Sequence, residues 1–471
     1  MTDLIYPTID LFLFDLKYSL GDTEEELERY KETFLKKLPK DVDKSGLKIK
    51  NDSDNEYFHL LDSTYQLIKP KDESYEVYFY PVQLGDSYGL LMHCSINNKT
   101  DAQPANSFAS IKLELEQILN NETATIGQTW MLSGWLSPNQ TKSQEEIAQA
   151  CYQALLSGCD WERDLEGQGQ FLGATIFELT YNNQHIIIVI YPDENTSEHI
   201  ANKFYSDWMR LFYFRHKISW AYSQSQVLKN SLQGVFRTIK VSNDDIAEDR
   251  RKGDELNALY ERLVYVQNTL NAYTADLAIL DFQGGTIDIN LSNYEKRLHT
   301  IEEKADKSKP GAQTELRFFR KFSELVKDKY RLQVTKDSEN LERGSKILSY
   351  KINVVRSQVE AEKVRRDKDF QNFVTFLSGG WAFGSFITAL PGLDKNNDNP
   401  VRSYLIKSFH INVSTQPATQ QETWWLIPAT KGIYTLGGFI TAILVLLIWR
   451  HFWRQYRSPL KEEIIQKSIS N

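Results

Sequence analysis

The pair of side chains best suited to nucleophilic chemistry is His93-Cys94, which stands in an apolar, strand-like stretch. An imidazole close to a thiol can generate a thiolate nucleophile. Adjacent residues of a β-strand, however, point to opposite faces of the sheet. The two side chains therefore cannot act on each other, and we favour a structural role for both.

A second candidate pair is Arg210 and His216, which share a helical stretch that faintly resembles ribonuclease-like helical motifs. The residues between them are mostly large and apolar, which is typical of a helix that packs into a core. The sequence also lacks a phosphate-binding loop, a dinucleotide-binding glycine motif, a His-Glu-x-x-His motif and a Gly-x-Ser-x-Gly motif. We therefore predict no catalytic residue, no cofactor and no enzymatic activity.

A polar stripe near the carboxyl end is the strongest candidate functional feature. Its small and polar residues recur at steps of four and three, which places them on one helical face within an uncharged segment. They are Gln371, Thr375, Ser378, Ala382 and Ser385. One interpretation is the lining of a pore. The other is helix–helix packing, which the spacing of Gly380 and Gly384 also fits.

Two segments, 370–392 and 431–450, are predicted to be transmembrane helices, since each has about the 20 residues needed to cross a bilayer. The first segment and the stretch 432–449 of the second contain no charged residue. Aromatic residues suited to the membrane interface flank the second segment. They are Trp424, Trp425, Trp449 and Trp453. Basic residues precede the first segment and follow the second, which places both chain ends in the cytoplasm. The alternative is that the segments are buried core helices.

The membrane interpretation divides the end of the chain into four parts: the two helices, an outer loop at 393–430 and a cytoplasmic tail at 451–471. It predicts a multi-pass protein of the cytoplasmic (inner or plasma) membrane, with the lipid bilayer as a partner. Asp394 and Asp398 in the loop make a cation a candidate partner, although exposed acidic residues are usually only solvated.

A helical stalk is predicted over 236–369. Apolar residues recur there at alternating steps of three and four, the pattern of a helix that packs along one seam. They include Leu263, Val266, Leu270, Tyr273 and Leu280, and later Leu341, Leu348, Ile352, Val355 and Val359. We expect Gly284-Gly285 to end the first helix, a second helix to start at Ser292, and Pro310-Gly311 to end that one. The seam is consistent with a homo-oligomer or with a three-helix bundle within one chain.

Residues 1–235 are predicted to form a mixed α/β domain, so that the fold class of the whole chain is α+β. Helical capping boxes at Thr23/Glu26 and Ser143/Glu146 each follow a strand pattern. Units 1–120 and 121–235 therefore look like a duplicated βαββα unit, and chance agreement of short apolar patterns is the alternative.

The composition limits the classes of partner. The 471-residue chain has a formal net charge of −8, which argues against nucleic acid. Three cysteines, Cys94, Cys151 and Cys159, fit neither a zinc site nor a disulfide framework. The first residues do not have the pattern of a secretory signal peptide.

The order of parts resembles the CorA family of divalent-cation channels: an α/β domain, a helical stalk, a first membrane helix, a loop and a basic end. The family's Gly-Met-Asn signature is absent, and 389–392 (Ala-Leu-Pro-Gly) stands in its place. The resemblance implies a homo-oligomeric channel gated by its cytosolic domain. The preferred hypothesis is a membrane-tethered α/β domain that binds a ligand or partner in signalling or regulation, with the CorA-like channel as the alternative.

Overall fold

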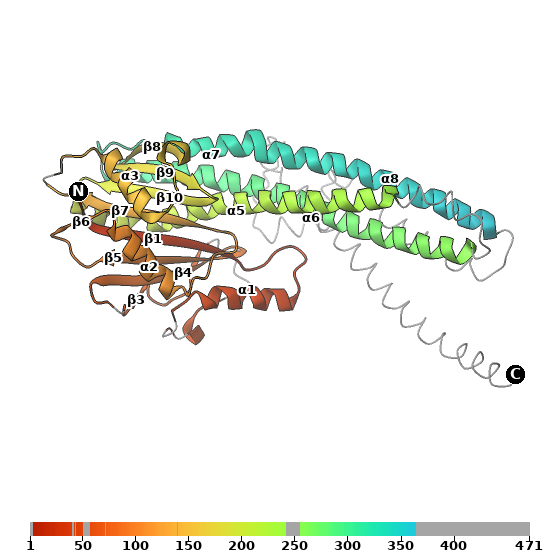
Figure 1. The fold of residues 1–471 in the computed structure, drawn as a ribbon, viewed down its shortest axis with the longest axis horizontal. Coiled ribbons are helices and arrows are strands. Elements are labelled where there is room, and N and C mark those ends of the chain that lie inside the picture. The colour runs from red at the N-terminus through yellow and green to blue at the C-terminus, as the bar shows by residue number, and fades with distance from the viewer. Residues whose placement is uncertain are drawn as a thin grey trace, which may run out of the picture. The chain divides into compact units, whose positions relative to one another are not determined.

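The computed structural model of the chain describes residues 3–39, 42, 44–49, 57–70, 72–138, 140–241 and 255–363 (Figure 1). The chain divides into two compact units, Met1–Arg356 and Ser357–Asn471. Almost all described residues belong to the first unit, to which the following account applies.

Strands and helices are interspersed up to β10, after which only helices follow among the described elements. In chain order they are β1 (Asp3–Leu16), α1 (Glu24–Lys36), η1 (Lys44–Gly46), β2 (Phe58–His59), β3 (Gln66–Ile68), β4 (Tyr75–Leu84), β5 (Ser87–Ile96), β6 (Ala102–Pro104), α2 (Ser107–Ile118), β7 (Gly127–Leu136), α3 (Gln144–Leu155), α4 (Trp161–Asp164), β8 (Leu165–Phe171), β9 (Ala174–Tyr181), β10 (Gln184–Tyr191), α5 (Glu194–Val241), α6 (Glu255–Ser308), η4 (Arg317–Phe319), α7 (Arg320–Leu325), η5 (Val326–Arg331) and α8 (Leu332–Lys363).

One ten-stranded sheet forms the centre of the unit, in the order β2-β4-β5-β1-β7-β10-β9-β8, with β3 on β4 and β6 on β1. β1 pairs antiparallel with both β5 and β7. β7 and β10 pair in parallel, which makes them the exception among the described strand pairs. A parallel neighbour needs a long crossover connection, and the chain between these two strands supplies it.

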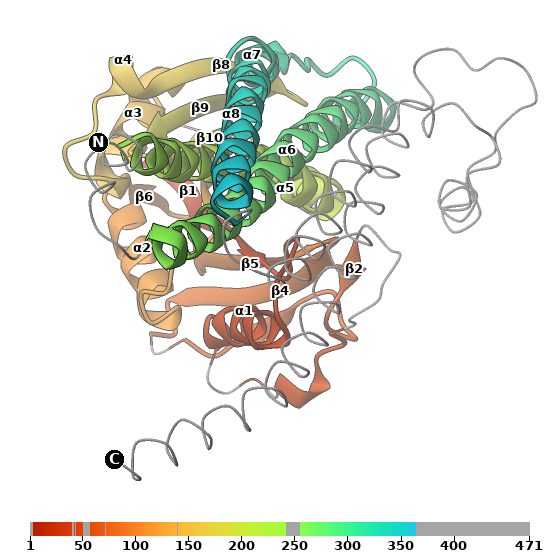
Figure 2. The ribbon, with the colours of Figure 1, turned by 90° about the vertical axis from the view of Figure 1, so that its right-hand side faces the viewer.

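Both faces of the sheet are covered. Along β1, Ile9, Leu11 and Leu13 alternate with Phe12 and Phe14, and all five are nearly inaccessible to solvent. The first set faces α1, α2 and α3 in one apolar core. Figure 2 shows α1 on one side of β4 and β5, and α5 and α6 on the other. The predicted capping boxes that begin α1 and α3 are confirmed.

The second face of the sheet packs against the first half of α5. Phe12 contacts Phe212 edge to face at 5.2 Å, and Phe14 lies 5.9 Å from the ring of Tyr213. Aromatic pairs in these orientations add stabilisation beyond the area that they bury. The apolar run Leu211–Phe214 is therefore core, as its composition predicts.

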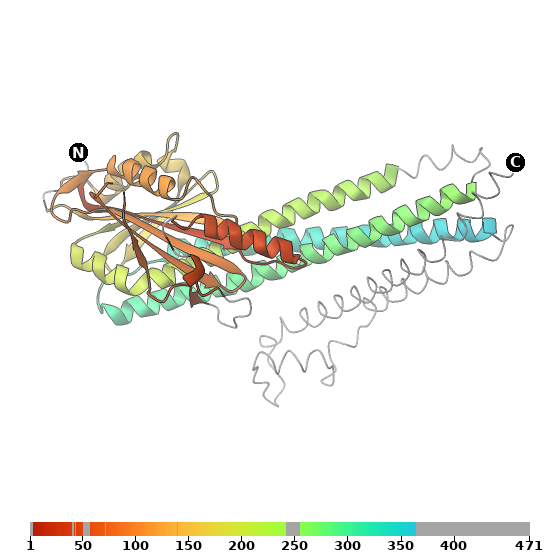
Figure 3. The same cartoon turned by 90° about the horizontal axis from the view of Figure 1, so that it is seen from below.

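Beyond the sheet, α5, α6 and α8 lie side by side (Figures 1 and 3). The rings of Tyr222 and Tyr330 stack 4.0 Å apart, and the Tyr273 hydroxyl donates to the Leu341 carbonyl at 2.8 Å. The predicted seam residues named above are buried, whereas Leu277, which the same spacing also includes, is partly exposed. The seam is therefore occupied by helices of the same chain.

The prediction that Gly284-Gly285 ends a helix is wrong, and so is a new helix start at Ser292, because α6 continues through both. A glycine costs a helix only about 1 kcal/mol. The buried residues Gln283 and Ile287 on either side hold the helix in the bundle, and a Cβ at Gly284 would lie in contact with Val334 at 3.5 Å. The predicted break at Pro310-Gly311 is confirmed.

The mixed α+β class, with a large sheet and a long helical stalk, is confirmed. The strands of 1–120 and 121–235 share one sheet, joined through β1 and β7. The duplication stays a prediction. In the first half β1 pairs antiparallel with β5, whereas in the second half β7 pairs parallel with β10.

No helix in the part of the chain that the structure describes is both long enough and apolar enough to cross a membrane. α5 and α6 have 48 and 54 residues, but charged side chains recur along both, and their apolar residues face the bundle and the sheet. The two predicted spans, 370–392 and 431–450, lie outside the described residues, as do 393–430 and 451–471.

We therefore correct the predicted function and location. The membrane-tethered domain, the CorA-like ion channel and the multi-pass placement in the cytoplasmic membrane all required spanning helices, and the described helices include none. The physical reason is that the long helices are amphipathic bundle helices, which bury one face against protein. None of these assignments enters the function proposed below.

Candidate ligand pocket

The ten site residues predicted from the sequence lie outside the described residues. These are the stripe positions Gln371, Thr375, Ser378, Gly380, Gly384 and Ser385 and the interface residues Trp424, Trp425, Trp449 and Trp453. The described residues include no group of three or more His, Cys, Asp or Glu that could hold a metal ion. The cation therefore stays a prediction.

In the two candidate pairs of the sequence, His93, Cys94 and His216 are buried and Arg210 is partly exposed. Cys94 lies in the apolar core, whereas His93 faces the other side of the sheet and bonds to Asp10, so the opposite orientation of the pair is confirmed. Arg210 pairs with Asp207 at 3.3 Å. His216 joins a separate network on the second face of the sheet. No member of these pairs acts on its proposed partner.

A pocket of about 680 Å³ lies at the carboxyl ends of β7 and β10. The two strands are parallel neighbours, and each is followed by a helix. α3 leaves β7 for the apolar face of the sheet, and α5 leaves β10 for the opposite face. In open α/β sheets, a crevice of this kind outside the strand ends is where ligands commonly bind.

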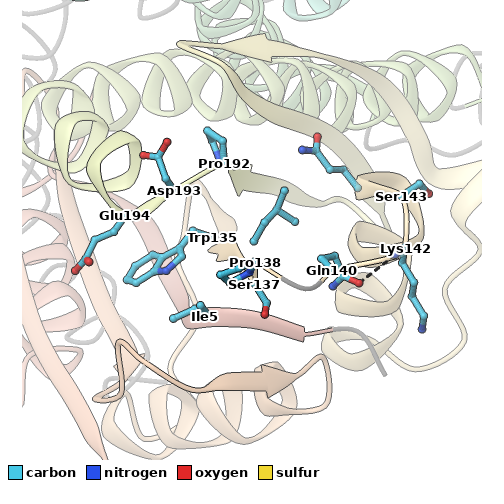
Figure 4. Close-up of a pocket in the computed structure, with 12 residues that line it drawn as sticks. Ile5, Trp135, Ser137, Pro138, Gln140, Lys142, Ser143, Pro192, Asp193 and Glu194 are labelled. Atoms are coloured by element: carbon cyan, nitrogen blue, oxygen red, sulfur yellow. Dashed lines mark hydrogen bonds between the residues drawn. The ribbon is translucent and has the colours of Figure 1, made fainter.

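The pocket has apolar and polar walls (Figure 4). Its apolar surface comes from β1, from the end of β7 and from two prolines that terminate the strands. The lining residues are Ile5, Trp135, Leu136, Ser137, Pro138, Gln140, Lys142, Ser143, Gln144, Pro192, Asp193 and Glu194. Figure 4 shows Asp193 and Glu194 at one end of the pocket and Lys142 and Ser143 at the other.

A bulge in β1 shapes the wall beside Trp135. The pairing of β1 with β7 shifts register between Ile5 and Thr8, and Tyr6 there has a φ of 51°. The Tyr6 ring stacks on Trp135 at 5.3 Å and its hydroxyl donates to Glu76 at 3.0 Å. Burial raises the pKa of Tyr6, so its hydroxyl stays protonated. The Tyr6 ring therefore supports Trp135 in the wall of the pocket.

Both helix starts at the pocket are capped by the chain itself. Ser143 and Glu146 form the capping box of α3. The backbone hydrogen bond from Ser143 keeps the pKa of Glu146 low, so the helix begins with a carboxylate. At the start of α5, the Thr196 N–H donates to Asp193 Oδ1 at 2.7 Å. Acidic groups already complement both helix dipoles, which disfavours a phosphate there.

A network of buried polar side chains connects β7, β9, β10 and α5 within the same half of the sheet. Thr129 Oγ1 lies 2.8 Å from His185 Nδ1 and 2.8 Å from His216 Nε2. His185 Nε2 lies 3.2 Å from Glu178 Oε1, and Arg215 pairs with the same oxygen at 3.1 Å. One hydrogen-bonded chain thus fixes α5 on the strands.

The proton positions of this network follow from its charges. Burial, followed by the nearby positive charge of Arg215, lowers the pKa of His185 well below its usual value. Burial and His185 do the same for His216. Neutral His185 donates to Glu178 through Nε2 and accepts from Thr129 through Nδ1. The Thr129 oxygen therefore accepts from His216 Nε2–H.

The order of Thr129, His185 and Glu178 is that of a hydroxyl–imidazole–carboxylate triad. Each of the three residues is at most 2 % exposed, so a substrate cannot reach the hydroxyl. A Cβ at Gly127 would come within 2.4 Å of His216 Nδ1, so the β7 backbone closes the network on that side. The arrangement supports a structural role, and the absence of enzymatic activity stays a prediction.

Sequence reasoning missed the pocket because its residues come from loops that follow two separate strands. One signal was present: a strand pattern ends at Leu136 and a capping box starts seven residues later at Ser143, as expected of a strand followed by a helix. The parallel pairing of β7 with β10 could not be read from that signal. No family model matches the chain, and no curated protein and no solved structure matches it either.

Proposed function

We propose that the α/β part of this chain is a ligand-binding sensor module that takes a small polar molecule into the pocket at the ends of β7 and β10. The observation that carries the proposal is the position of the pocket, between two adjacent parallel strands whose following helices leave to opposite faces. Its volume, about 680 Å³, lies in the range of small-molecule sites.

The link to the stalk supports a sensor. α5 begins at the pocket with Glu194 and continues for 48 residues, so its first turn lines the pocket and its far part belongs to the stalk. Asp207 on α5 pairs with Arg297 at 3.0 Å and with Lys304 at 2.6 Å, which ties α6 to α5. A ligand that shifts the first turn of α5 would therefore act on both helices.

Binding can be tested by saturation-transfer NMR on the full chain with a mixture of amino acids, short peptides, sugars and nucleosides. We expect a subset to bind, and Ser137→Phe, which places a ring in the pocket, to abolish that binding. Ser63→Phe, on an exposed loop outside the pocket lining, is the matched control. The proposal would be contradicted if no compound bound the wild-type chain. It would also be contradicted if the compounds bound Ser137→Phe and Ser63→Phe equally well.

The sensor role is tested separately by hydrogen exchange. With a binding compound present, amide exchange should slow in the first turns of α5 and change in α6 near Arg297. A change confined to the loops around the pocket would leave a binding module without a sensor role.

Self-association of the stalk is a second candidate function. The predicted seam is occupied within the chain, but α8 carries a second apolar stripe at helical spacing: Ile347, Tyr350 and Val354 are 46 %, 69 % and 39 % exposed. Pairing of two copies through this stripe would bury it. Light scattering should then show a dimer of the wild-type chain and a monomer of the Tyr350→Glu variant. A monomeric wild-type chain would refute self-association through this stripe.

A further inference from the structure

The charged groups that line the pocket differ in whether the chain itself compensates them. Glu194 is paired with Lys99, whose ammonium lies 3.3 Å from it and 3.2 Å from Glu198. Glu146, beside the pocket, is occupied by the capping box. The carboxylates of Glu194 and Glu146 are therefore already engaged within the chain, and a ligand would gain little by pairing with them.

Two charged lining groups, both exposed to solvent, form no ion pair with a residue that the structure describes. Asp193 uses Oδ1 to cap α5, and its Oδ2 has no hydrogen-bonding or ion-pairing partner within the described ranges. Lys142 is held through its backbone N–H, which donates to Gln140 Oε1 at 3.1 Å. Its ammonium forms no ion pair with any residue that the structure describes, although it lowers the pKa of Glu146 weakly.

The charges of Asp193 and Lys142 have opposite signs and lie at opposite ends of the pocket (Figure 4). Between them the lining is apolar, with Trp135, Pro138 and Pro192. Gln144 adds a side-chain amide, fixed through its oxygen by the Thr175 hydroxyl. A ligand that fits this order has a cation at one end, an anion at the other and a neutral, partly apolar middle with amide groups.

We propose that the pocket binds a short zwitterionic peptide, with its amino group at Asp193 and its carboxylate at Lys142. The inference rests on the proposed function and narrows it to one class of ligand. Charge-assisted hydrogen bonds at both ends would fix the direction of the peptide. A peptide of a few residues carries its two charges at opposite ends, and the pocket of about 680 Å³ has room for it.

The test uses tri-alanine and two derivatives, titrated calorimetrically into the full chain. N-acetyl-tri-alanine lacks the cation, and tri-alanine amide lacks the anion. We expect tri-alanine to bind and each derivative to bind about tenfold more weakly, since a charged hydrogen bond contributes on the order of this factor.

Two variants assign each end of the peptide to its residue. Asp193→Asn keeps an oxygen to cap α5 but loses the charge, so acetylation of the peptide should then have no further effect. In Lys142→Gln, amidation should have no further effect. Glu342→Gln and Lys346→Gln, an exposed pair on α8, are matched charge controls and should behave like the wild type.

The outcomes separate the two proposals. If a sugar or nucleoside binds in a manner blocked by Ser137→Phe and tri-alanine does not bind, the ligand-binding function stands and the peptide inference falls. If tri-alanine binds but both derivatives bind equally well in the wild type, the charged ends are not recognised and the inference is also overturned.

Discussion

The two faces of the sheet are buried to a similar degree but by different means. Under α1, α2 and α3 the core is a continuous apolar cluster, and its one strong buried charge pair among the described residues is that of Lys37 with Asp15. Under α5, large aromatic rings alternate with buried polar groups such as Asp10, His93, Glu178 and His185. Hydrophobic burial is non-directional, whereas hydrogen bonds fix distances and angles. The first face therefore supplies stability, and the second specifies where α5 lies.

This difference matters because α5 is the helix that starts at the pocket and enters the stalk. Asp10 illustrates the specification: its carboxylate bonds to His93 Nδ1 at 2.7 Å and accepts from the Tyr205 hydroxyl of α5 at 2.5 Å. A purely apolar contact would tolerate a shift of α5 by a fraction of a turn. The hydrogen bond between Tyr205 and Asp10 would not, because the shift would break it.

Removal of the Glu178 charge should break the second face most severely. Glu178→Leu leaves Arg215 and the His185 N–H without their acceptor. An uncompensated buried charge costs about 4 kcal/mol in the free energy of unfolding. Urea denaturation measures this decrease in the free energy of unfolding. The decrease should be smaller in Glu178→Gln, which keeps an acceptor oxygen. Equal losses would mean that the missing charge accounts for the whole effect and that the retained acceptor oxygen contributes nothing.

A cavity in the first face should cost slightly less. Leu132 on β7 is fully buried in the apolar cluster. Leu132→Ala should lower the free energy of unfolding by about 3 kcal/mol through lost burial and an unfilled space. The loss should be the same at pH 7.5 and pH 5.5, because no titrating group is involved. A loss that varied with pH would refute the contrast between the faces.

Acidification should weaken the second face alone. The pKa values of His185 and His216 are lowered in the folded state, so below about pH 6.5 only the unfolded state binds the extra protons. Their contribution is present above that pH and is lost as the pH falls. The raised pKa of Glu178 acts in the opposite sense and offsets part of the loss.

We therefore expect unfolding free energy to fall by about 2 kcal/mol between pH 7.5 and pH 5.5 through these groups. Urea titrations at several pH values measure the slope. The double variant His185→Gln, His216→Gln should be less stable but should lose most of this pH dependence. If the double variant kept the same dependence of unfolding free energy on pH, groups other than these two histidines would cause it.

The smallest expected effect concerns the hydroxyl that joins α5 to β1. Tyr205→Phe keeps the ring against Phe12 but removes the donor to Asp10. A single lost hydrogen bond to a buried carboxylate should cost about 1 kcal/mol. Hydrogen exchange should also speed up in α5 around this position more than in α3. Uniform exchange changes would argue against a local role.

Local patterns predicted much of this fold. The capping boxes at Thr23 and Ser143 and the buried seam of the stalk follow from residue spacing, because these features involve neighbours in sequence. The predicted helix end at Gly284-Gly285 was wrong, because burial of the neighbouring residues in the bundle outweighs the small loss of helix propensity at glycine. The membrane assignment relied on hydropathy and on the aromatic and basic flanks of two segments, and the described helices do not support it.

The candidate site could not be predicted in the same way. Lys142 and Asp193 are 51 positions apart, and they line one pocket only because β10 inserts parallel to β7. The same holds for Thr129, His185 and His216, which come from three elements.

The sequence by itself determined which stretches become strands and helices and which of their faces are apolar, since those properties depend on periodicity over a few residues. Only the tertiary structure decided which strands are neighbours and in which direction they run. It also decided that the stalk seam is filled by the same chain. These choices depend on the packing of residues that are distant in sequence, and the pocket and the polar network exist only as its result.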